Sequence, residues 1–326
     1  MLCKLFLTKE VISVDALTHA LIGLAVGGLS GQVPSVDLPL YLAVLLGSQA
    51  PDFDIVTAAR GGMTYMKQHR AASHSLLGAA FWAAVIATGI HAVLPQLAWL
   101  TLWRWTLAGA LSHIAVDTLN THGAALLWPL CTKRLSLPLL PVFDPVLFMI
   151  FLTPVLAGPA MNQLSGLSFA AALLYLMIRL VLRQAASRRL QMQFPDCLPG
   201  RLMIIPSLQQ RMYWDYILET PTHYVTGSLG LLSAPAGVSA SLLKEAASPL
   251  LAQAETTGLA GFFRHFTPFA YFETVRSGCE TAVKISDLRY FGSDGFRHSA
   301  LLVYDNNESV AACYVMSYGR TWTFTS

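Results

Sequence analysis

The sequence predicts a mainly α protein with two parts: a polytopic helical membrane domain over residues 1–189 and a small α+β soluble domain over residues 190–326. Composition is the first reason, because 54% of the residues are hydrophobic and only 12% are charged, about half the charged fraction of a soluble domain. The second reason is a series of long apolar runs before residue 189. The third is a change to short, alternating runs after it.

Apolar runs define the helices expected in the first domain. A full membrane span needs about 20 residues. The third and fourth runs meet that length, whereas the first two are short and rich in glycine, which predicts short spans or a hairpin that crosses in part. The fifth run begins at Pro145 and contains Pro154, which predicts a kink. The expected helices cover residues 16–30, 38–50, 73–94, 97–121, 144–158 and 166–184.

Positive charge sets the expected orientation of these helices, because cytoplasmic loops are rich in Lys and Arg. The opposite loops, near 31–37, 95–96 and 159–165, carry neither residue, and Arg104 alone falls toward their side. The pattern predicts six alternating spans in a bacterial inner membrane, with both termini and the soluble domain in the cytoplasm. The cytoplasmic cations are Lys4, Lys9, Arg60, Lys67, Arg70, Lys133, Arg134, Arg179, Arg183, Arg188 and Arg189.

Two classes of site are excluded by the rest of the composition. No cluster of Lys and Arg interleaves with aromatic residues, so we expect a lipid bilayer and no nucleic acid as partner. The cysteines lie far apart without a C-x-x-C pair, which argues against a disulfide framework and against a thiolate zinc site. They are Cys3, Cys131, Cys197, Cys279 and Cys313.

Histidines and carboxylates gather at the cytoplasmic face of the predicted topology. His113 and Asp117 are spaced i, i+4 on a helix, so both side chains share one face. Each polar residue has a simpler explanation when taken alone: a helix stop, a solvated loop histidine or a histidine bonded to a backbone carbonyl. Together they require several buried polar groups to find partners in one layer, and one metal cluster satisfies them all. The metal ligands predicted from these residues are His19, Asp54, His69, His74, His113 and Asp117.

This donor set predicts hydrolytic chemistry at the membrane interface. Histidine and carboxylate without thiolate suit Zn²⁺, with Mn²⁺ and Fe²⁺ as alternatives. A metal lowers the pKa of a bound water to about 7 and makes it a nucleophile. Asp52 or Asp144 is the expected general base, and Arg70 the expected clamp for an anionic group such as phosphate. The expected substrate is a phosphoester or another amphiphilic molecule.

Two other classes of function remain open at this point. A transporter or permease would use intramembrane His and Asp as a proton relay, but its ionisable residues would be spread through the membrane depth. A catalytically silent membrane scaffold would tolerate loss of the histidines.

The motifs resemble those of the YdjM/YfhP-type inner-membrane proteins, which are described as metal-dependent hydrolases. The resemblance covers about residues 15–185 and implies an integral membrane protein with a hydrolase-like metal site. The order of His and Asp residues is also similar to that of zinc-dependent phospholipase C and P1 nuclease, which implies His122 as a further ligand. This chain lacks the later His-x-x-x-Glu of that pattern. The motifs are Asp15-x-x-Thr18-His19, Pro51-Asp52-x-Asp54, His69-Arg70, Ser73-His74-Ser75 and His113-x-x-x-Asp117 with Asn120-x-x-Gly123.

Alternating apolar residues predict strands in the C-terminal domain. Residues 213–219 and 223–226 alternate around a Thr220-Pro221 turn, and residues 300–304 and 310–315 flank a turn at Asp305-Asn306-Asn307. Residues 240–266 are expected to be helical.

Overall fold

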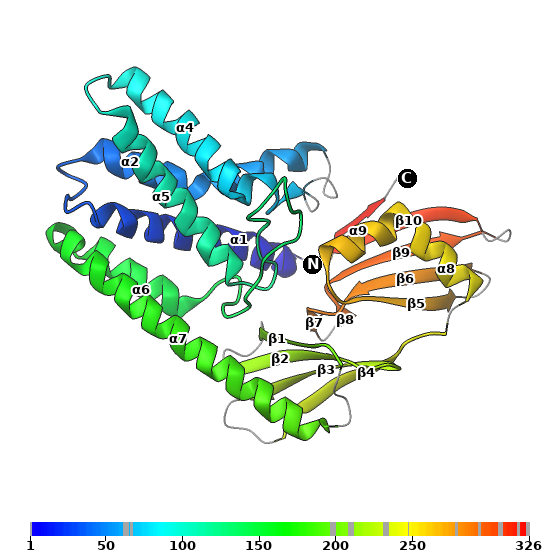
Figure 1. Ribbon diagram of the computed structural model, residues 1–326. Coiled ribbons are helices and arrows are strands. Elements are labelled where there is room, and N and C mark those ends of the chain that lie inside the picture. Colours follow the sequence, from blue (N-terminus) through cyan, green and yellow to red (C-terminus); the bar gives the residue numbers. More distant parts are fainter. Residues whose placement is uncertain are drawn as a thin grey trace. The chain divides into compact units, whose positions relative to one another are not determined.

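The computed structural model describes residues 2–60, 65, 68–195, 200–207, 212–230, 235–246, 248–277, 280–292, 295–305, 309–317 and 320–323. The chain forms two compact units, Met1–Val181 and Leu182–Ser326. About half of the described chain is helical, and the second unit contains two multi-stranded sheets (Figure 1). The expected order, a helical region followed by an α+β region, is confirmed. The chain as a whole is therefore α+β and not mainly α, and the two units divide inside the last long helix.

Helices of the first unit follow the expected apolar runs closely. The largest difference is α1, which begins well before residue 16 because neither proline nor glycine interrupts residues 2–14. His19 therefore lies within this helix and not at its start. The helices are α1 (Leu2–Gly28), α2 (Leu38–Gln49), η1 (Ala50–Arg60), η2 (Ala72–His74), α4 (Leu76–Val93), α5 (Trp99–Thr118), α6 (Pro145–Leu156), η3 (Gly158–Ala160) and α7 (Met161–Gln193).

Within the described residues, two helical segments are long and apolar enough to cross a membrane: α4, and the η3–α7 segment Gly158–Gln193, which continues from the first unit into the second. Only 17% and 22% of their apolar windows are buried, so most of that surface faces outward. Leu77 and Phe81 on α4 are both 61% exposed, and Leu173 and Leu174 on α7 are similarly exposed. By contrast, α2 and α6 have 12 residues each and extend about 18 Å, less than the ~30 Å of a hydrocarbon core.

Glycines bring α2 and α5 into close contact. A Cβ on Gly109 would lie 2.3 Å from the carbonyl oxygen of Val44, and one on Gly47 would lie 2.2 Å from that of Thr106. The backbones can approach this closely because neither glycine has a side chain. The approach places the end of α2 beside His113 on α5, where the site described below is formed.

We expect Gly109→Ala to destabilise the protein by about 1–3 kcal/mol, because the added methyl group must push two backbones apart. Gly89→Ala on α4 is the matched control, since a Cβ there meets nothing within 4 Å. Thermal unfolding of both variants in detergent tests this. Equal melting temperatures for the two variants would show that the α2–α5 contact is not tight.

Two antiparallel sheets and two helices form most of the second unit (Figure 1). The strand orders are β1-β2-β3-β4 and β11-β10-β9-β6-β5, with β7 paired to β8. The elements are β1 (Leu202–Pro206), β2 (Tyr213–Glu219), β3 (His223–Gly230), β4 (Gly237–Leu243), α8 (Pro249–Thr256), α9 (Gly258–Phe266), β5 (Ala270–Ser277), β6 (Glu280–Asp287), β7 (Phe291–Gly292), β8 (Gly295–Phe296), β9 (His298–Tyr304), β10 (Val310–Ser317) and β11 (Arg320–Thr323).

Both predicted hairpins of the second unit are confirmed. β2 pairs with β3 around the Thr220-Pro221 turn, and β9 pairs with β10; Asn306 and Asn307 of the second turn lie outside the described residues. The expected helix over 240–266 is wrong at its start. Residues 240–243 belong to β4, and α8 begins only at Pro249, where the Ser248 hydroxyl accepts a hydrogen bond from the Leu251 N–H.

A buried histidine makes the second unit sensitive to acid. Burial lowers the pKa of His298 from 6.5 to about 4, although the Asp287 carboxylate opposes the shift. Between these pH values the unfolded chain binds a proton at His298 and the folded chain does not, so acid removes about 3 kcal/mol of stability. Burial raises the pKa of Asp215 to about 6, which acts in the opposite direction over much of the same range.

Comparison with His298→Gln isolates the histidine, because Asp215 affects both proteins equally. We expect the stability of the wild-type protein relative to the variant to fall by about 3 kcal/mol from pH 7.5 to pH 4. Urea unfolding at both pH values measures the difference. A difference that does not change with pH would contradict the assignment.

Candidate metal centre

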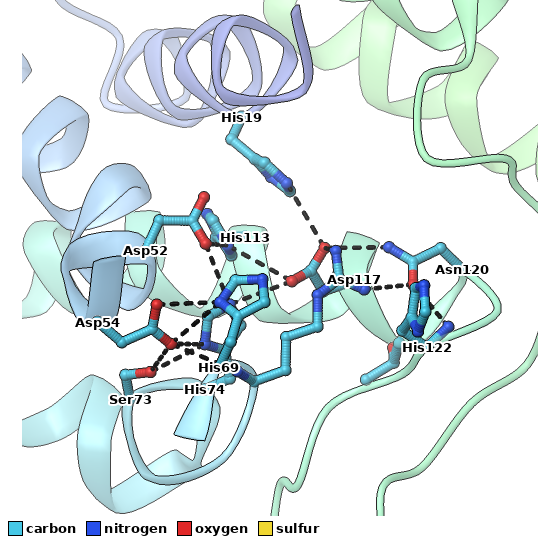
Figure 2. Close-up of polar contacts among 12 residues, drawn as sticks. His19, Asp52, Asp54, His69, Ser73, His74, His113, Asp117, Asn120 and His122 are labelled. Carbon is cyan, nitrogen blue, oxygen red and sulfur yellow. Dashed lines mark hydrogen bonds and ion pairs between the residues drawn. The ribbon is translucent and has the colours of Figure 1, made fainter. Parts of the chain in front are cut away.

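Four donor atoms from three segments of the first unit converge on one point. His113 and Asp117 come from α5, His74 from η2 and Asp52 from η1 (Figure 2). His74 Nε2 lies 3.2 Å from Asp117 Oδ2 and 3.4 Å from Asp52 Oδ1. His113 Nε2 lies 3.6 Å from each of the same two oxygens. We call Asp52, His74, His113 and Asp117 the four-donor cluster.

The four separations are close to those between neighbouring ligands of one metal ion. A tetrahedral site with ligands 2.0–2.1 Å from zinc places its donor atoms about 3.3–3.4 Å apart. The Nε2 atoms of His74 and His113 and the Oδ2 atom of Asp117 are buried and, among the described residues, have no hydrogen-bond partner. Buried polar atoms rarely remain unpaired. A cation bound by these three atoms, with Asp52 Oδ1 beside it, would satisfy them together.

Hydrogen bonds at the far side of each imidazole turn its Nε2 lone pair toward the centre. His113 Nδ1 lies 2.7 Å from the carbonyl oxygen of Ser48, which only accepts, so Nδ1 carries the proton. Ser73 Oγ donates to Asp54 Oδ2 at 2.8 Å, and therefore accepts from His74 Nδ1 at 3.0 Å. Metal-binding histidines are oriented by this kind of bond, which selects the tautomer that can coordinate.

Arg70 orients the Asp117 carboxylate from the other side. Its guanidinium lies 3.0 Å from Asp117 Oδ1 and donates to Asn120 Oδ1 at 2.5 Å, while Asn120 Nδ2 donates to Asp117 Oδ1 at 3.1 Å. Asp117 Oδ1 is thus occupied and Oδ2 is left for the cluster. Arg70 is buried and has φ +62, a left-handed conformation that is unfavourable for a residue with a side chain. The geometry gives Arg70 a positioning role, and the anion clamp expected for it stays a prediction.

Asp54 and His69 form a bonded pair next to the cluster. His69 Nδ1 lies 3.0 Å from Asp54 Oδ1. Asp52, His74 and His113 form one group with donor atoms within 4.8 Å of one another, and Asp52, Asp54 and His69 form a second. Burial raises the pKa of Asp54, but bonds from His69 and Ser73 hold it below its ordinary value. Burial likewise raises the pKa of Asp52, and the stronger combined effect of His113 and His74 lowers it well below that value. Both carboxylates are therefore ionised at neutral pH, as metal ligands must be.

His19 approaches the cluster from α1 (Figure 2). Its ring stacks on that of His113 at 3.7 Å between centroids, and its Nε2 lies 3.7 Å from Asp117 Oδ1. His19, His113 and Asp117 form a third group of metal-binding geometry. Asp15, one helical turn before, has an oxygen 3.7 Å from His19 Nε2. It is part of the quoted motif but was not predicted as a site residue.

Two predicted site residues are not part of the four-donor cluster. Asp144 caps α6: its Oδ1 accepts from the Val146 and Leu147 N–H groups at 3.0 Å, and its Oδ2 accepts from the Tyr175 hydroxyl at 2.7 Å. We therefore reassign it from general base to helix cap. His122 is in none of the three groups, and its N–H donates to Asn120 Oδ1. Ser75, which follows His74, caps α4 by accepting a hydrogen bond from the Gly78 N–H.

Several features of the site have no sequence signal. The Ser48 carbonyl that orients His113 is a backbone atom, so its role appears only once α2 and α5 are packed. Tyr65, whose ring stacks on His69 at 4.7 Å, lies in a segment without periodicity.

Lys67, Cys197 and Cys279 lie outside the described residues, while Cys131 and Cys313 are free thiols.

Helices with outward-facing apolar surface and a buried His/Asp cluster define a membrane protein with a candidate metal centre. The chain belongs to the YdjM inner membrane protein family, which matches residues 14–186 and so includes the whole cluster. It is also 28% identical over 225 residues to the uncharacterized protein YfhP of Bacillus subtilis (strain 168), covering 66% of this chain and 68% of that protein. No solved structure matches. The likeness to zinc-dependent phospholipase C and P1 nuclease stays a prediction.

Proposed function

We propose that this inner membrane protein is a divalent-metal-dependent hydrolase that acts on a phosphoester at the membrane interface. The observation that carries the proposal is the four-donor cluster, in which each of two imidazole nitrogens lies 3.2–3.6 Å from an oxygen of each of two carboxylates, close to the spacing of ligands on one ion. Nitrogen and oxygen donors suit Zn²⁺ best, with Mn²⁺ and Fe²⁺ as alternatives.

Unequal burial divides the cluster into a fixed part and an accessible part. His74, His113 and Asp117 are at most 1% exposed, whereas the side chain of Asp52 is 37% exposed. Catalytic zinc sites commonly have three protein ligands and one open position. When bound, the ion would polarise a phosphoryl oxygen and activate a water molecule near neutral pH. His74, His113 and Asp117 would hold the ion and leave one position for that water, and the exposed Asp52 carboxylate beside that position can accept a proton from the water.

Multi-pass topology is part of the proposal. We propose that α4 and α7 cross the bilayer together with α1 and α5, that the shorter α2 and α6 cross it in part, and that the cluster lies at the cytoplasmic side. Support comes from the absence of Lys and Arg in the loops at residues 31–37, 95–96 and 159–165. Support also comes from the exposed apolar side chains of α4 and α7.

Asp52→Asn tests whether the exposed carboxylate of the cluster acts as a general base. We expect the variant to keep the ion, held by the three buried donors, and to lose about 100-fold or more in turnover, the size of effect typical of a general base. The assay is a panel of phosphoesters with chelator-treated and metal-reloaded protein, alongside elemental analysis. Hydrolysis that survives chelation in the wild-type protein would refute the proposed function, and metal loss in the variant would make Asp52 an essential ligand.

A further inference from the structure

We infer that residues 127–137, here called the 127–137 loop, insert into the headgroup layer of an anionic phospholipid leaflet. The loop thereby opens the four-donor cluster to an amphiphilic substrate with an anionic headgroup carried by that leaflet. The insertion follows from surface chemistry alone, whereas the substrate class rests on the proposed function.

Large apolar side chains project from this loop. Leu130 is 92% exposed, and Leu127, Leu135 and Leu137 are between 41% and 52% exposed. Trp128 is 37% exposed among them. The loop connects α5 to α6 and is neither a helix nor a strand, so helix packing does not account for its exposed side chains. Contiguous exposed apolar side chains mark a surface that contacts a partner or a membrane.

Hydrogen bonds attach the loop, and the two residues just before it, to the segments that carry the site. Ala125 N donates to the carbonyl oxygen of Arg70 at 3.1 Å, and Leu76 N donates to that of Leu126 at 3.0 Å. Ala124 and Leu135 exchange two backbone hydrogen bonds at the base of the loop. Arg134 Nη2 donates to the carbonyl oxygen of His69 at 2.7 Å. The position of the loop in a membrane therefore determines the depth of the cluster.

The charge and the residue types of the loop favour contact with an anionic lipid leaflet. Lys133 is exposed within the loop, next to Arg134, and residues 127–137, all of which are described, contain no carboxylate. Trp and Lys beside exposed leucines are typical of segments at the boundary between headgroups and hydrocarbon. Basic residues at this depth are attracted to anionic lipids. We choose a lipid leaflet over a second protein chain because this chain belongs to an inner membrane protein family.

Exposed apolar residues also occur in η1, the segment that carries Asp52. Ile55 and Val56, which follow Asp54 in η1, are 56% and 71% exposed. Exposed apolar side chains therefore occur in two segments close to the cluster in the chain or through hydrogen bonds, η1 and the 127–137 loop. A substrate whose tail remains in the leaflet can present its headgroup to the cluster.

A fluorophore at position 130 tests the insertion without any assay of activity. The five cysteines are replaced by alanine, Leu130→Cys is labelled with an environment-sensitive dye, and the full chain is reconstituted in vesicles containing phosphatidylglycerol. Val238→Cys, a 54% exposed aliphatic position on β4, is the matched control. We expect doxyl-labelled lipid to quench the label at 130 and aqueous iodide to quench the label at 238.

Two results would overturn the insertion: iodide quenching at 130 equal to that at 238, or shielding of position 130 from both quenchers, which would mean that protein covers it. Lys133→Glu is expected to reduce lipid quenching at 130 in anionic vesicles and to leave it unchanged in phosphatidylcholine vesicles. An equal change in both lipids would overturn the choice of an anionic leaflet.

Leu130→Asp tests the substrate class. We expect it to lower turnover of phosphatidic acid in vesicles by about tenfold, because a charge replaces an inserted side chain, and to change turnover of soluble p-nitrophenyl phosphate less than twofold, since the metal ligands are untouched. Equal effects on both substrates would overturn the amphiphile. If the wild-type protein hydrolyses neither, the proposed function and the substrate class fail together, while the quenching result still decides the insertion.

Discussion

His113→Ala is expected to release the divalent ion and to abolish metal-dependent hydrolysis. The variant removes one of the three fully buried donors. Mutation of a residue that merely orients a ligand costs about 10–100-fold in metal affinity, so loss of the ligand itself should cost at least the upper end of that range. Elemental analysis after dialysis and competition with a chromophoric chelator measure the affinity.

His122→Ala is the matched control for this experiment. His122 lies near Asp117 in the chain and was predicted as a ligand, but it belongs to none of the three groups of donor atoms. We expect His122→Ala to retain the ion with affinity within a few-fold of the wild-type protein. The site assignment fails if both variants lose the ion equally, or if His113→Ala keeps it.

Asp117→Asn is expected to destabilise the metal-free protein by about 3–5 kcal/mol, because it removes the carboxylate partner of the buried Arg70 guanidinium. The Arg70 side chain is only 8% exposed and would retain its bond to Asn120 but not the opposing charge. Chemical or thermal unfolding in the presence of chelator isolates this effect from metal binding.

The double variant Arg70→Met, Asp117→Asn provides the control. Replacing both members of a buried ion pair is often close to neutral, so we expect it to recover much of the lost stability. A single variant within 1 kcal/mol of the wild-type protein would mean that the pair contributes nothing to folding, and that Arg70 is available for an anionic substrate.

The helices and hairpins were predictable because each depends on local chemistry. Long apolar runs placed α4 and α5, and the Pro145 start of α6 followed from its proline. Alternation around Thr220-Pro221 placed β2 and β3. The start of α8 was missed because Ser239 and Ser241 alternate within an apolar segment that also suits a helix. The division between units inside α7 was not visible either, since nothing in that helix interrupts its periodicity.

The candidate site was predictable as a set of residues but not as a set of roles. One-sided placement of His and Asp pointed to a shared cluster, and the i, i+4 spacing correctly placed His113 and Asp117 on one face. Sequence could not show which carboxylate of Asp52 and Asp54 faces the two histidines, because the two residues are close in the chain and η1, which holds both, was not predicted as a helix. Nor could it show that Asp144 caps a helix, since the same Asp-Pro pair suits a loop.

Anomalous X-ray diffraction at the zinc edge, on crystals of the full chain grown with zinc, tests the metal centre most directly. We expect one strong peak among Asp52 Oδ1, His74 Nε2, His113 Nε2 and Asp117 Oδ2, about 2 Å from each nitrogen. Zinc bound only at other residues, or no peak in this cluster at full zinc loading, would contradict the assignment of the metal centre.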